Sequence, residues 1–501
     1  MFVLEKIKEY AATDRAALIN REERLSYAEL ERLSNSFAEY LLRRYGDDRS
    51  PVVIYGHKET LILPCIYGAL KAGRAYVPID ITVPADRVRQ IAEDVQCRVA
   101  VDFYGLGLSG CDILLKDGLS DALHSGTGKP ISDSLWVKGD EHAYILFTSG
   151  SSGKPKGVPI TANNLENLHR ELMPRMDIKA EPGVILNQIS YSFDVSVVSV
   201  YMGISKGFTL YTIDKQMVEN LGELFEFFEK SRLSYWVSTP SFAEMCIQSD
   251  RFRGDLMPEL EKFLFCGEVL THKLVDGLMA RFAGAEIINT YGPTEATVLC
   301  TAVSVTKEMA ADGLQIPIGY PLGEVTLRVA DEAGEERPSR EQGELLIISD
   351  NVGPGYYKRP DLTEKAFFTD EATGKRGYRT GDSCFEKDGL YYYCGRLDNQ
   401  IKVNGFRVEI EDIENNMTRA ENVSRAAVIP VDDGEKVQYL HAFVLLQRSD
   451  GLTQLKRATK IKNELKEFLP SYMIPRKIQA VESFPLNTNG KVDKKELRKL
   501  L

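Results

Sequence analysis

An α/β fold, made of a large N-terminal domain of sheets layered with helices and a small α+β C-terminal domain, is predicted by three features of the sequence. The chain has 501 residues, more than one hydrophobic core normally supports. Strand-like and helix-like patterns alternate over most of its length, which is typical of βα units and substantially parallel sheet. The pattern changes from about Asp388. We therefore expect a boundary at Asp398, with residues 1–397 in the large domain and residues 398–501 in the small one.

The alternation is clear near the N-terminus. Tyr27–Tyr40 has helical spacing, and Ser26 ahead of it is a favourable N-cap. A strand, a helix closed by Gly73 and a second strand are then predicted at Val52–Tyr55, Leu61–Ala72 and Ala75–Asp80. In the small domain we expect a compact strand–helix–strand region with a helix near Leu455–Leu469.

Composition is ordinary for a soluble globular protein, with 43% hydrophobic and 27% charged residues. No apolar stretch approaches the roughly eighteen residues of a membrane span, and the first residues lack the pattern of a signal peptide. The eight cysteines are scattered without a Cys-x-x-Cys pair, which fits a reducing compartment and argues against a structural metal. We expect a cytoplasmic protein without a membrane span.

Charge is spread unevenly along the chain. From Gly395 to the end there are 19 lysines and arginines against 15 aspartates and glutamates, although the whole chain has a net charge of −11. Two interpretations stay open: two ordinary solvated surfaces, or a basic C-terminal module that meets an acidic partner or a triphosphate. Without an arginine and aromatic stripe, an overall negative chain is a poor nucleic-acid binder.

A loop rich in glycine and hydroxyl residues follows a predicted buried strand at Tyr144–Phe147. It runs from Thr148 to Gly157 and contains two lysines, so its backbone N–H groups, hydroxyls and charges could wrap a polyphosphate. A solvated turn is the alternative, and the spacing is not that of a Walker loop. By contrast, we interpret the GxGxxG match at Gly105–Gly110 as a glycine-rich connection, because Cys111–Leu115 resembles another strand instead of a helix.

Several further segments carry polar groups in tight turns. They are Asn289–Glu295, Tyr378–Asp382, Gly395–Lys402 and Asn489–Asp493. Each alone could be a capped turn. In this order, together with the glycine-rich loop, they resemble the adenylate-forming superfamily of acyl-CoA synthetases, luciferases and peptide-synthetase adenylation domains. The resemblance covers the whole chain and implies a mobile small domain and two half-reactions, in which a carboxylate attacks the ATP α-phosphate and a thiol then captures the acyl-adenylate.

The resemblance implies a role for particular residues in binding ATP. It assigns Asn289 to a hydrogen bond with adenine, Tyr291 to stacking on the base, Thr294 to the α-phosphate and Asp382 to the ribose hydroxyls. The other implied ATP contacts are Thr148, Ser149 and Gly150 in the phosphate loop, Thr290, Gly292 and Pro293 in the second segment, and Tyr393, Arg396 and Lys491.

Catalytic roles follow from the same resemblance. Lys491 would bridge the substrate carboxylate and the nucleotide, and Arg396 would lie beside the nucleotide. Glu295 would hold Mg²⁺, so ATP and Mg²⁺ are the expected cofactors. Asp398 would be the hinge of the small domain. These roles suit phosphoryl displacement, which is catalysed by positioning and by charge stabilisation.

An amino-acid substrate is favoured by Asp194, which lies in the apolar run Ser192–Val198. An ionised carboxylate in such surroundings needs a cation partner. A helix cap or an internal salt bridge is the structural alternative. In amino-acid-activating relatives the matching aspartate binds the substrate α-ammonium.

The segments Pro240–Cys246, Phe263–Glu268 and Glu295–Val298 resemble the superfamily branch that ligates D-alanine to a D-alanyl carrier protein. In that branch the cysteine matching Cys266 packs against the substrate methyl group, and Val298 would line the same pocket; a small buried hydrophobe is the alternative for Cys266. The resemblance implies D-alanine as substrate and a separate small acidic carrier with a phosphopantetheine thiol, supplying D-alanyl groups for teichoic acids. We expect a monomer.

Two other functions stay open. One is a stand-alone adenylating enzyme for another small amino acid, such as L-alanine or glycine, that feeds a peptide-synthetase-type carrier. The other is a non-catalytic nucleotide-binding or scaffold relative, against which the presence of Lys491, Glu295 and Asp382 together argues.

Overall fold

The computed structural model describes residues 1–501 except 151–154, 399, 404, 434–435, 449 and 486–491. Its contacts divide the chain into two compact units. The first unit contains Met1–Ile81, Ala92–Leu146 and Gly157–Leu397, and the second contains Thr82–Ile91, Phe147–Lys156 and Asp398–Leu501. Helices and several sheets are mixed along the chain, so the predicted α/β class is confirmed.

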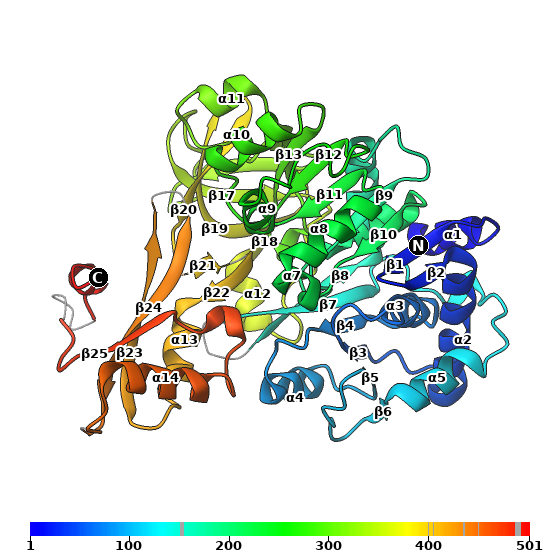
Figure 1. The fold of residues 1–501 in the computed structure, drawn as a ribbon, viewed down its shortest axis with the longest axis horizontal. Coiled ribbons are helices and arrows are strands. Elements are labelled where there is room, and N and C mark those ends of the chain that lie inside the picture. Colours follow the sequence, from blue (N-terminus) through cyan, green and yellow to red (C-terminus); the bar gives the residue numbers. More distant parts are fainter. Residues whose placement is uncertain (151–154, 399, 404, 434–435, 449, 486–491) are drawn as a thin grey trace. The chain divides into compact units, whose positions relative to one another are not determined.

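The largest sheet of the first unit has nine strands within the described residues (Figure 1). Its six central strands are parallel, and the strands at both edges are antiparallel to their neighbours. In spatial order the strands are β15 (Tyr320–Pro321), β14 (Thr301–Ser304), β13 (Glu286–Tyr291), β12 (Lys262–Phe265), β11 (Tyr235–Ser238), β9 (Val184–Asn187), β10 (Thr209–Thr212), β1 (Ala16–Asn20) and β2 (Glu23–Ser26).

Both faces of this sheet are buried, which explains why its central strands are largely apolar. In β11, Tyr235 and Val237 join one hydrophobic cluster while Trp236 between them joins another, as the two-residue period of a strand requires. The Trp236 cluster is completed by side chains from α8 (Leu221–Lys230), α9 (Pro240–Ile247) and α10 (His272–Arg281).

A second sheet contains the strands that the sequence predicts near the N-terminus. Its spatial order is β6 (Asp112–Leu114), β5 (Val99–Asp102), β3 (Val52–Tyr55), β4 (Tyr76–Ile79), β7 (His142–Thr148) and β8 (Lys156–Thr161). The predicted strand at Val52–Tyr55 is confirmed, and so is the strand after the GxGxxG match, because β6 begins at Asp112. The carboxyl ends of β3 and β4 lie side by side in this parallel pair.

The helices that accompany these sheets follow local sequence signals. The predicted helix after Ser26 is α2 (Tyr27–Tyr45), which begins with a reciprocal capping box between Ser26 and Glu29. The predicted helix before Gly73 is α3 (Ile62–Lys71). The remaining helices outside the C-terminal region are α1 (Phe2–Tyr10), α4 (Ala85–Asp94), α5 (Lys116–His124), α6 (Ala162–Leu172), α7 (Lys215–Glu219), α11 (Lys307–Ala311), α12 (Pro360–Ala366), the π-helix η3 (Val198–Gly203) and the 3₁₀ turns η1 (Asp133–Leu135), η2 (Met173–Arg175) and η4 (Thr294–Ala296).

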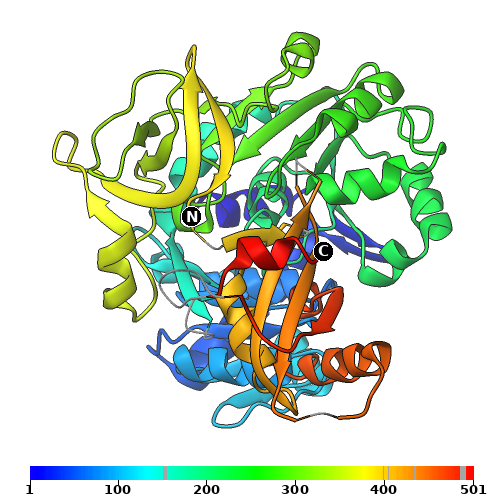
Figure 2. The same ribbon diagram turned by 90° about the vertical axis from the view of Figure 1, so that its left-hand side faces the viewer.

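A third, antiparallel sheet of the first unit carries the long strand β19 (Figure 2). It consists of β16 (Thr326–Ala330), β17 (Gly343–Ile348), β19 (Arg376–Lys387), β18 (Phe367–Thr369) and β20 (Leu390–Arg396). In the β19–β20 hairpin, Asp382 lies opposite Arg396, which brings two residues of different sequence motifs together.

The second unit has its own hydrophobic core, around Ile413, Val428 and Val444. Its C-terminal elements are the hairpin β21 (Gln400–Val403) and β22 (Phe406–Glu409), the sheet β23 (Val423–Asp432), β24 (Val437–Leu446) and β25 (Lys477–Ala480), the helices α13 (Ile410–Met417), α14 (Gln454–Leu465) and α15 (Lys494–Arg498), and the turn η5 (Ser471–Met473). The predicted helix near Leu455–Leu469 is confirmed as α14, which ends earlier, at Leu465. No helix in the described part of the chain is long and apolar enough to cross a membrane.

Candidate active site

The turn after β13 forms the centre of the candidate site in the first unit. Gly292 follows the strand directly, and a Cβ atom on it would approach the Val298 carbonyl oxygen to 2.4 Å. Only glycine fits there, so the turn can fold back on itself. Thr297 and Val298 both have positive φ angles, 57° and 70°, which completes the reversal. The compact turn keeps the polar residues of this short stretch close together in space.

Two residues at the end of β13 are fixed by hydrogen bonds. Asn289 Nδ2 donates to the Pro317 carbonyl over 2.8 Å, and Thr290 Oγ1 donates to the Phe265 carbonyl over 2.7 Å. Because the amide nitrogen of Asn289 is used in this way, its carbonyl oxygen points in the opposite sense and offers an acceptor. An acceptor matches the exocyclic amine of adenine.

Asp382 is held between two partners in the first unit. Arg396 Nη1 lies 2.7 Å from Asp382 Oδ1 and also donates to the Thr380 carbonyl over 2.8 Å, while the Tyr291 hydroxyl donates to Asp382 Oδ2. Burial and the neighbouring Asp382 charge raise the pKa of Tyr291 well above its usual value, so the phenol stays protonated. The structure thus brings together three predicted nucleotide contacts from three sequence motifs.

Asp194 and Thr294 also meet. The Thr294 hydroxyl donates to Asp194 Oδ2 over 2.6 Å, and only 4% of Asp194 is exposed. Asp194 was predicted to bind an ammonium group and Thr294 a phosphate, and the two residues are 100 positions apart in sequence. One hydrogen bond therefore joins the predicted amino-acid site to the predicted phosphate site.

Glu295 is fully buried, and its Oε1 atom accepts a hydrogen bond of 2.7 Å from the Tyr356 hydroxyl. Sequence reasoning missed Tyr356, which lies in the segment Gly353–Tyr357 without a recognisable pattern. A single carboxylate suits Mg²⁺, which keeps several waters and is usually held by one or two carboxylates together with substrate phosphates. The donor set around Glu295 therefore fits the ion that the sequence implies.

Cys266 and Val298, which the sequence predicts to line the substrate pocket, are neighbours in the first unit. Cys266 is 1% exposed, and its sulfur lies 4.0 Å from the Val298 carbonyl oxygen. The next residue, Gly267, faces the ring of Phe193, which an added Cβ would approach to 3.0 Å. The sulfur of Cys266 thus meets the backbone of Val298, and Gly267 lies against the ring of Phe193, which directly precedes Asp194 in the sequence.

The predicted phosphate loop begins in the second unit. The buried Oγ1 atom of Thr148 has no hydrogen-bond partner among the described residues, which is unusual for a hydroxyl and fits a polar ligand at this point. Ser149 Oγ donates to the Arg407 carbonyl over 2.8 Å and accepts from the Glu409 backbone over 3.1 Å. Gly150 is buried beside it, and residues 151–154 lie outside the described part of the chain.

The remaining predicted residues lie in different parts of the chain. Lys491 is outside the described residues. Tyr393 is on β20, opposite Cys384. Pro293 is the N-cap of the turn η4. Asp398 is exposed, starts the last segment of the second unit and accepts a hydrogen bond of 3.0 Å from the Gln400 backbone.

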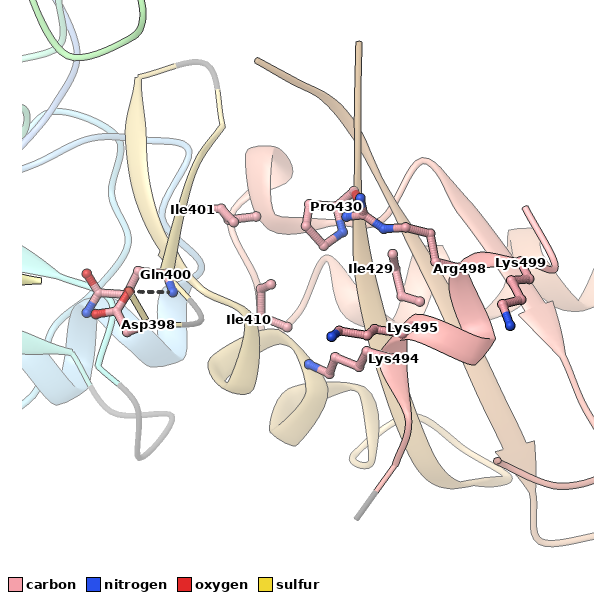
Figure 3. A pocket seen from close by; sticks show the side chains of 10 residues that line it. All are labelled: Asp398, Gln400, Ile401, Ile410, Ile429, Pro430, Lys494, Lys495, Arg498 and Lys499. Carbon is pink, nitrogen blue, oxygen red and sulfur yellow. Dashed lines mark hydrogen bonds between the residues drawn. The ribbon is translucent and has the colours of Figure 1, made fainter. Parts of the chain in front are cut away.

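A cavity of about 520 Å³ opens inside the second unit (Figure 3). Its lining combines an apolar floor with basic side chains of α15 and the residue after it: Asp398, Gln400, Ile401, Ile410, Ile429, Pro430, Lys494, Lys495, Arg498 and Lys499. Lys494 pairs with Glu414 over 2.7 Å, and Arg498 donates to the Pro430 carbonyl over 2.9 Å. Lys495, which extends toward Ile410, forms no ion pair with any described residue. Of the predicted site residues that the structure describes, only Asp398 lines this cavity.

Comparison with known proteins gives consistent matches. The family model of AMP-binding enzymes matches residues 5–357, and that of the C-terminal domain of AMP-binding enzymes matches residues 412–491. The chain is 40% identical to a D-alanine–D-alanyl carrier protein ligase of Bacillus cereus and 39% identical to one of Bacillus thuringiensis, each over 501 residues and 99% of both proteins.

Two solved structures share the fold. The Vibrio cholerae adenylation domain AlmE, in complex with glycyl-adenosine-5′-phosphate, has a TM-score of 0.83 at 24% identity, covering 100% of this chain and 96% of that one. The o-succinylbenzoate CoA synthetase of Bacillus subtilis has a TM-score of 0.85 at 18% identity, covering 99% and 98%.

Proposed function

Because the chain belongs to the AMP-binding enzyme family, we propose that it activates D-alanine with ATP and then loads it on a carrier protein. In the first half-reaction the D-alanine carboxylate attacks the α-phosphorus, giving D-alanyl-AMP and pyrophosphate. In the second, the phosphopantetheine thiol of the carrier attacks the acyl carbon, forms a thioester and releases AMP. The 40% identity to D-alanine–D-alanyl carrier protein ligases along the full chain supports both steps.

The hydrogen bond between Asp194 and Thr294 is the observation that carries this proposal. In an α-amino acid the ammonium and carboxylate groups are attached to the same carbon. A site that holds the ammonium while the carboxylate attacks a phosphate must therefore place its ammonium ligand next to its phosphate ligand. Asp194 is the ammonium ligand in this proposal, and Thr294 contacts the α-phosphate.

The other nucleotide contacts are supported by the geometry of the first unit. Asn289 accepts from the adenine amine, Tyr291 lies against the base, and Asp382, held by Arg396, binds the ribose hydroxyls. The buried hydroxyl of Thr148, unpartnered among the described residues, supports a phosphate contact together with its neighbours. The remaining residues assigned to the site are Ser149, Gly150, Thr290, Gly292, Pro293, Tyr393 and Lys491, the last of which bridges the substrate carboxylate and the nucleotide.

Glu295 would hold Mg²⁺ in this proposal, and the ion would supply positive charge that stabilises the phosphates of ATP. The buried hydrogen bond from Tyr356 supports this role, because ligating carboxylates are usually oriented by such a partner. The chain's own contribution is to fix the direction of the Glu295 carboxylate.

Selectivity for a small side chain is assigned to Cys266 and Val298. The 4.0 Å contact between the Cys266 sulfur and the Val298 carbonyl oxygen supports a shared place beside the substrate methyl group, and a substrate of opposite chirality would direct its methyl group elsewhere. L-Alanine and glycine are the competing substrates.

The small domain is proposed to comprise residues 398–501 and to turn about Asp398, with the break of the first unit after Leu397 in support. The carrier protein that accepts the D-alanyl group is proposed to be small and acidic. The basic side chains Lys494, Lys495 and Arg498 at the cavity of Figure 3 support an acidic partner. We place the enzyme in the cytoplasm as a monomer, supplying D-alanyl groups for teichoic acids.

The test is amino-acid-dependent exchange of pyrophosphate into ATP, run over D-alanine, L-alanine and glycine. We expect D-alanine to give the highest kcat/KM. Faster exchange with L-alanine or glycine would contradict the proposed substrate, and no exchange with any amino acid would indicate a non-catalytic relative. Loading of a phosphopantetheinylated carrier, followed by mass spectrometry, then tests the second half-reaction.

A further inference from the structure

The segment that leads to Asp194 is anchored by a loop from a different sheet. β9 ends at Asn187, and the irregular stretch Gln188–Phe193 connects it to Asp194. The anchoring loop follows β3 and supplies two side chains, His57 and Lys58. Both elements belong to the first unit.

Lys58 forms hydrogen bonds with the start of this stretch. Its Nζ atom donates to Asn187 Oδ1 over 2.9 Å and to the Ile189 carbonyl over 2.6 Å, and it lies 3.8 Å from the centre of the Tyr191 ring. Asn187 in turn donates to the Tyr191 hydroxyl over 2.9 Å. One lysine therefore fixes three positions of the segment.

The cost of burying this lysine argues for a role beyond stability. Lys58 is 2% exposed, and no described carboxylate forms an ion pair with it. Burial lowers the pKa of Lys58 well below its usual value, although the charges of Asp80 and Glu59 oppose this. Burying a cation without a paired anion destabilises the fold, and an apolar side chain at this position would destabilise it less.

His57 holds the next part of the segment through Asp80. His57 Nδ1 lies 2.7 Å from Asp80 Oδ2, and the same oxygen accepts from Ser190 Oγ over 2.8 Å. Ser190 Oγ is also 3.0 Å from Ser192 Oγ, and the Ser190 carbonyl accepts from the Phe193 backbone over 3.0 Å. This chain of contacts ends one residue before Asp194.

We propose that His57 and Lys58 are positioning residues of the amino-acid site, which hold residues 187–192 so that Asp194 is presented to the substrate ammonium group. This inference rests on the role of Asp194 proposed above. Neither residue touches the substrate, and both act through the segment that they anchor. Because small misplacements of a binding group are costly, their loss affects amino-acid binding more than ATP binding.

The experiment measures pyrophosphate exchange for Lys58→Met, His57→Ala and Ser190→Ala, with D-alanine and ATP varied separately. We expect the KM for D-alanine to rise about 10- to 100-fold, with the KM for ATP within about twofold of the parent value. His57→Gln retains a donor for Asp80 and should restore most of the loss caused by His57→Ala. Ser190→Ala is a mild change that keeps the test valid if Lys58→Met does not fold.

Lys71→Met is the matched control. Lys71 is also fully buried, but it pairs with Glu31 over 2.5 Å and contacts Ser34 and Asn35. We expect this variant to unfold at a lower temperature without a selective change in the KM for D-alanine. Equal changes in both KM values for Lys58→Met would overturn the positioning role.

Asp194→Asn separates this inference from the proposed function. If Asp194→Asn leaves the KM for D-alanine unchanged, the proposed ammonium ligand is wrong. If Asp194→Asn raises that KM while the Lys58, His57 and Ser190 variants do not, the anchoring role alone is overturned.

Discussion

Replacing Tyr356 by phenylalanine removes one hydroxyl from the surroundings of the fully buried Glu295. That hydroxyl donates to Glu295 Oε1 over 2.7 Å, and the phenyl ring would keep the volume of the side chain. Hydrogen bonds to charged groups contribute about 1.5–3 kcal/mol. About 1.4 kcal/mol corresponds to a factor of ten in an equilibrium constant. The apparent affinity for Mg²⁺ at Glu295 should therefore fall about 10- to 100-fold.

The assay is D-alanine-dependent pyrophosphate exchange over a Mg²⁺ titration at fixed ATP. We expect Tyr356→Phe to need about 10- to 100-fold more free Mg²⁺ for half-maximal exchange, with the KM for D-alanine little changed. Thermal unfolding of the same samples checks that the variant is folded.

Tyr357→Phe is the control, because Tyr357 follows directly in sequence and its hydroxyl has no hydrogen bond within the described residues. It should behave like the parent enzyme. An unchanged Mg²⁺ requirement in Tyr356→Phe would show that Tyr356 does not orient Glu295 for the metal.

Three further outcomes are expected. Cys266→Ala should raise the use of L-alanine relative to D-alanine, because one lost side-chain contact changes discrimination by about 1–3 kcal/mol; an unchanged preference in the exchange assay would remove Cys266 from selectivity. Lys491→Ala should abolish adenylate formation but spare transfer from preformed D-alanyl-AMP, and equal loss of both steps would make Lys491 structural. The third outcome is a pH dependence of stability that comes from His169. Burial is the main cause that lowers the pKa of His169 to about 4, and the charges of Lys206 and Lys6 add to it. The unfolded chain takes up this proton below about pH 6.5 and the folded chain only near pH 4, so stability is lost as the pH falls between them. We expect the free energy of unfolding, measured by chemical unfolding, to be lower at pH 5 than at pH 7 by on the order of 1 kcal/mol, because the partial exposure of His169 reduces the effect. This loss should be smaller in His169→Gln, and an equal loss in both proteins would contradict the assignment to His169.

Local signals were sufficient for much of the fold. The Ser26 cap and the periodicity after it predicted α2, whose capping box with Glu29 is a contact over three residues. The apolar run at Val52–Tyr55 predicted β3 with the observed bounds. These elements are set by interactions between near neighbours, which a sequence displays directly.

The roles of the site residues stay predictions, but the structure brings several of these residues together. The motifs around Thr294 and Asp382 named segments that do cluster, and the structure joins Asp194 to Thr294 and Tyr291 to Asp382. Tyr356 and Lys58 were missed, because neither lies in a pattern that local spacing can reveal. Tyr356 meets Glu295 across 61 positions, and Lys58 meets Asn187 across 129.

The sequence alone indicates the class of reaction and of substrate. The order of its polar turns resembles one superfamily, and Asp194 in an apolar run indicates a substrate with an amine. How that chemistry is held in place became visible only in the folded chain. The β3 loop brings His57 and Lys58 to the segment before Asp194, and a buried hydroxyl from Tyr356 reaches Glu295. Such positioning depends on contacts between distant parts of the chain, and these contacts exist only once the sheets have formed.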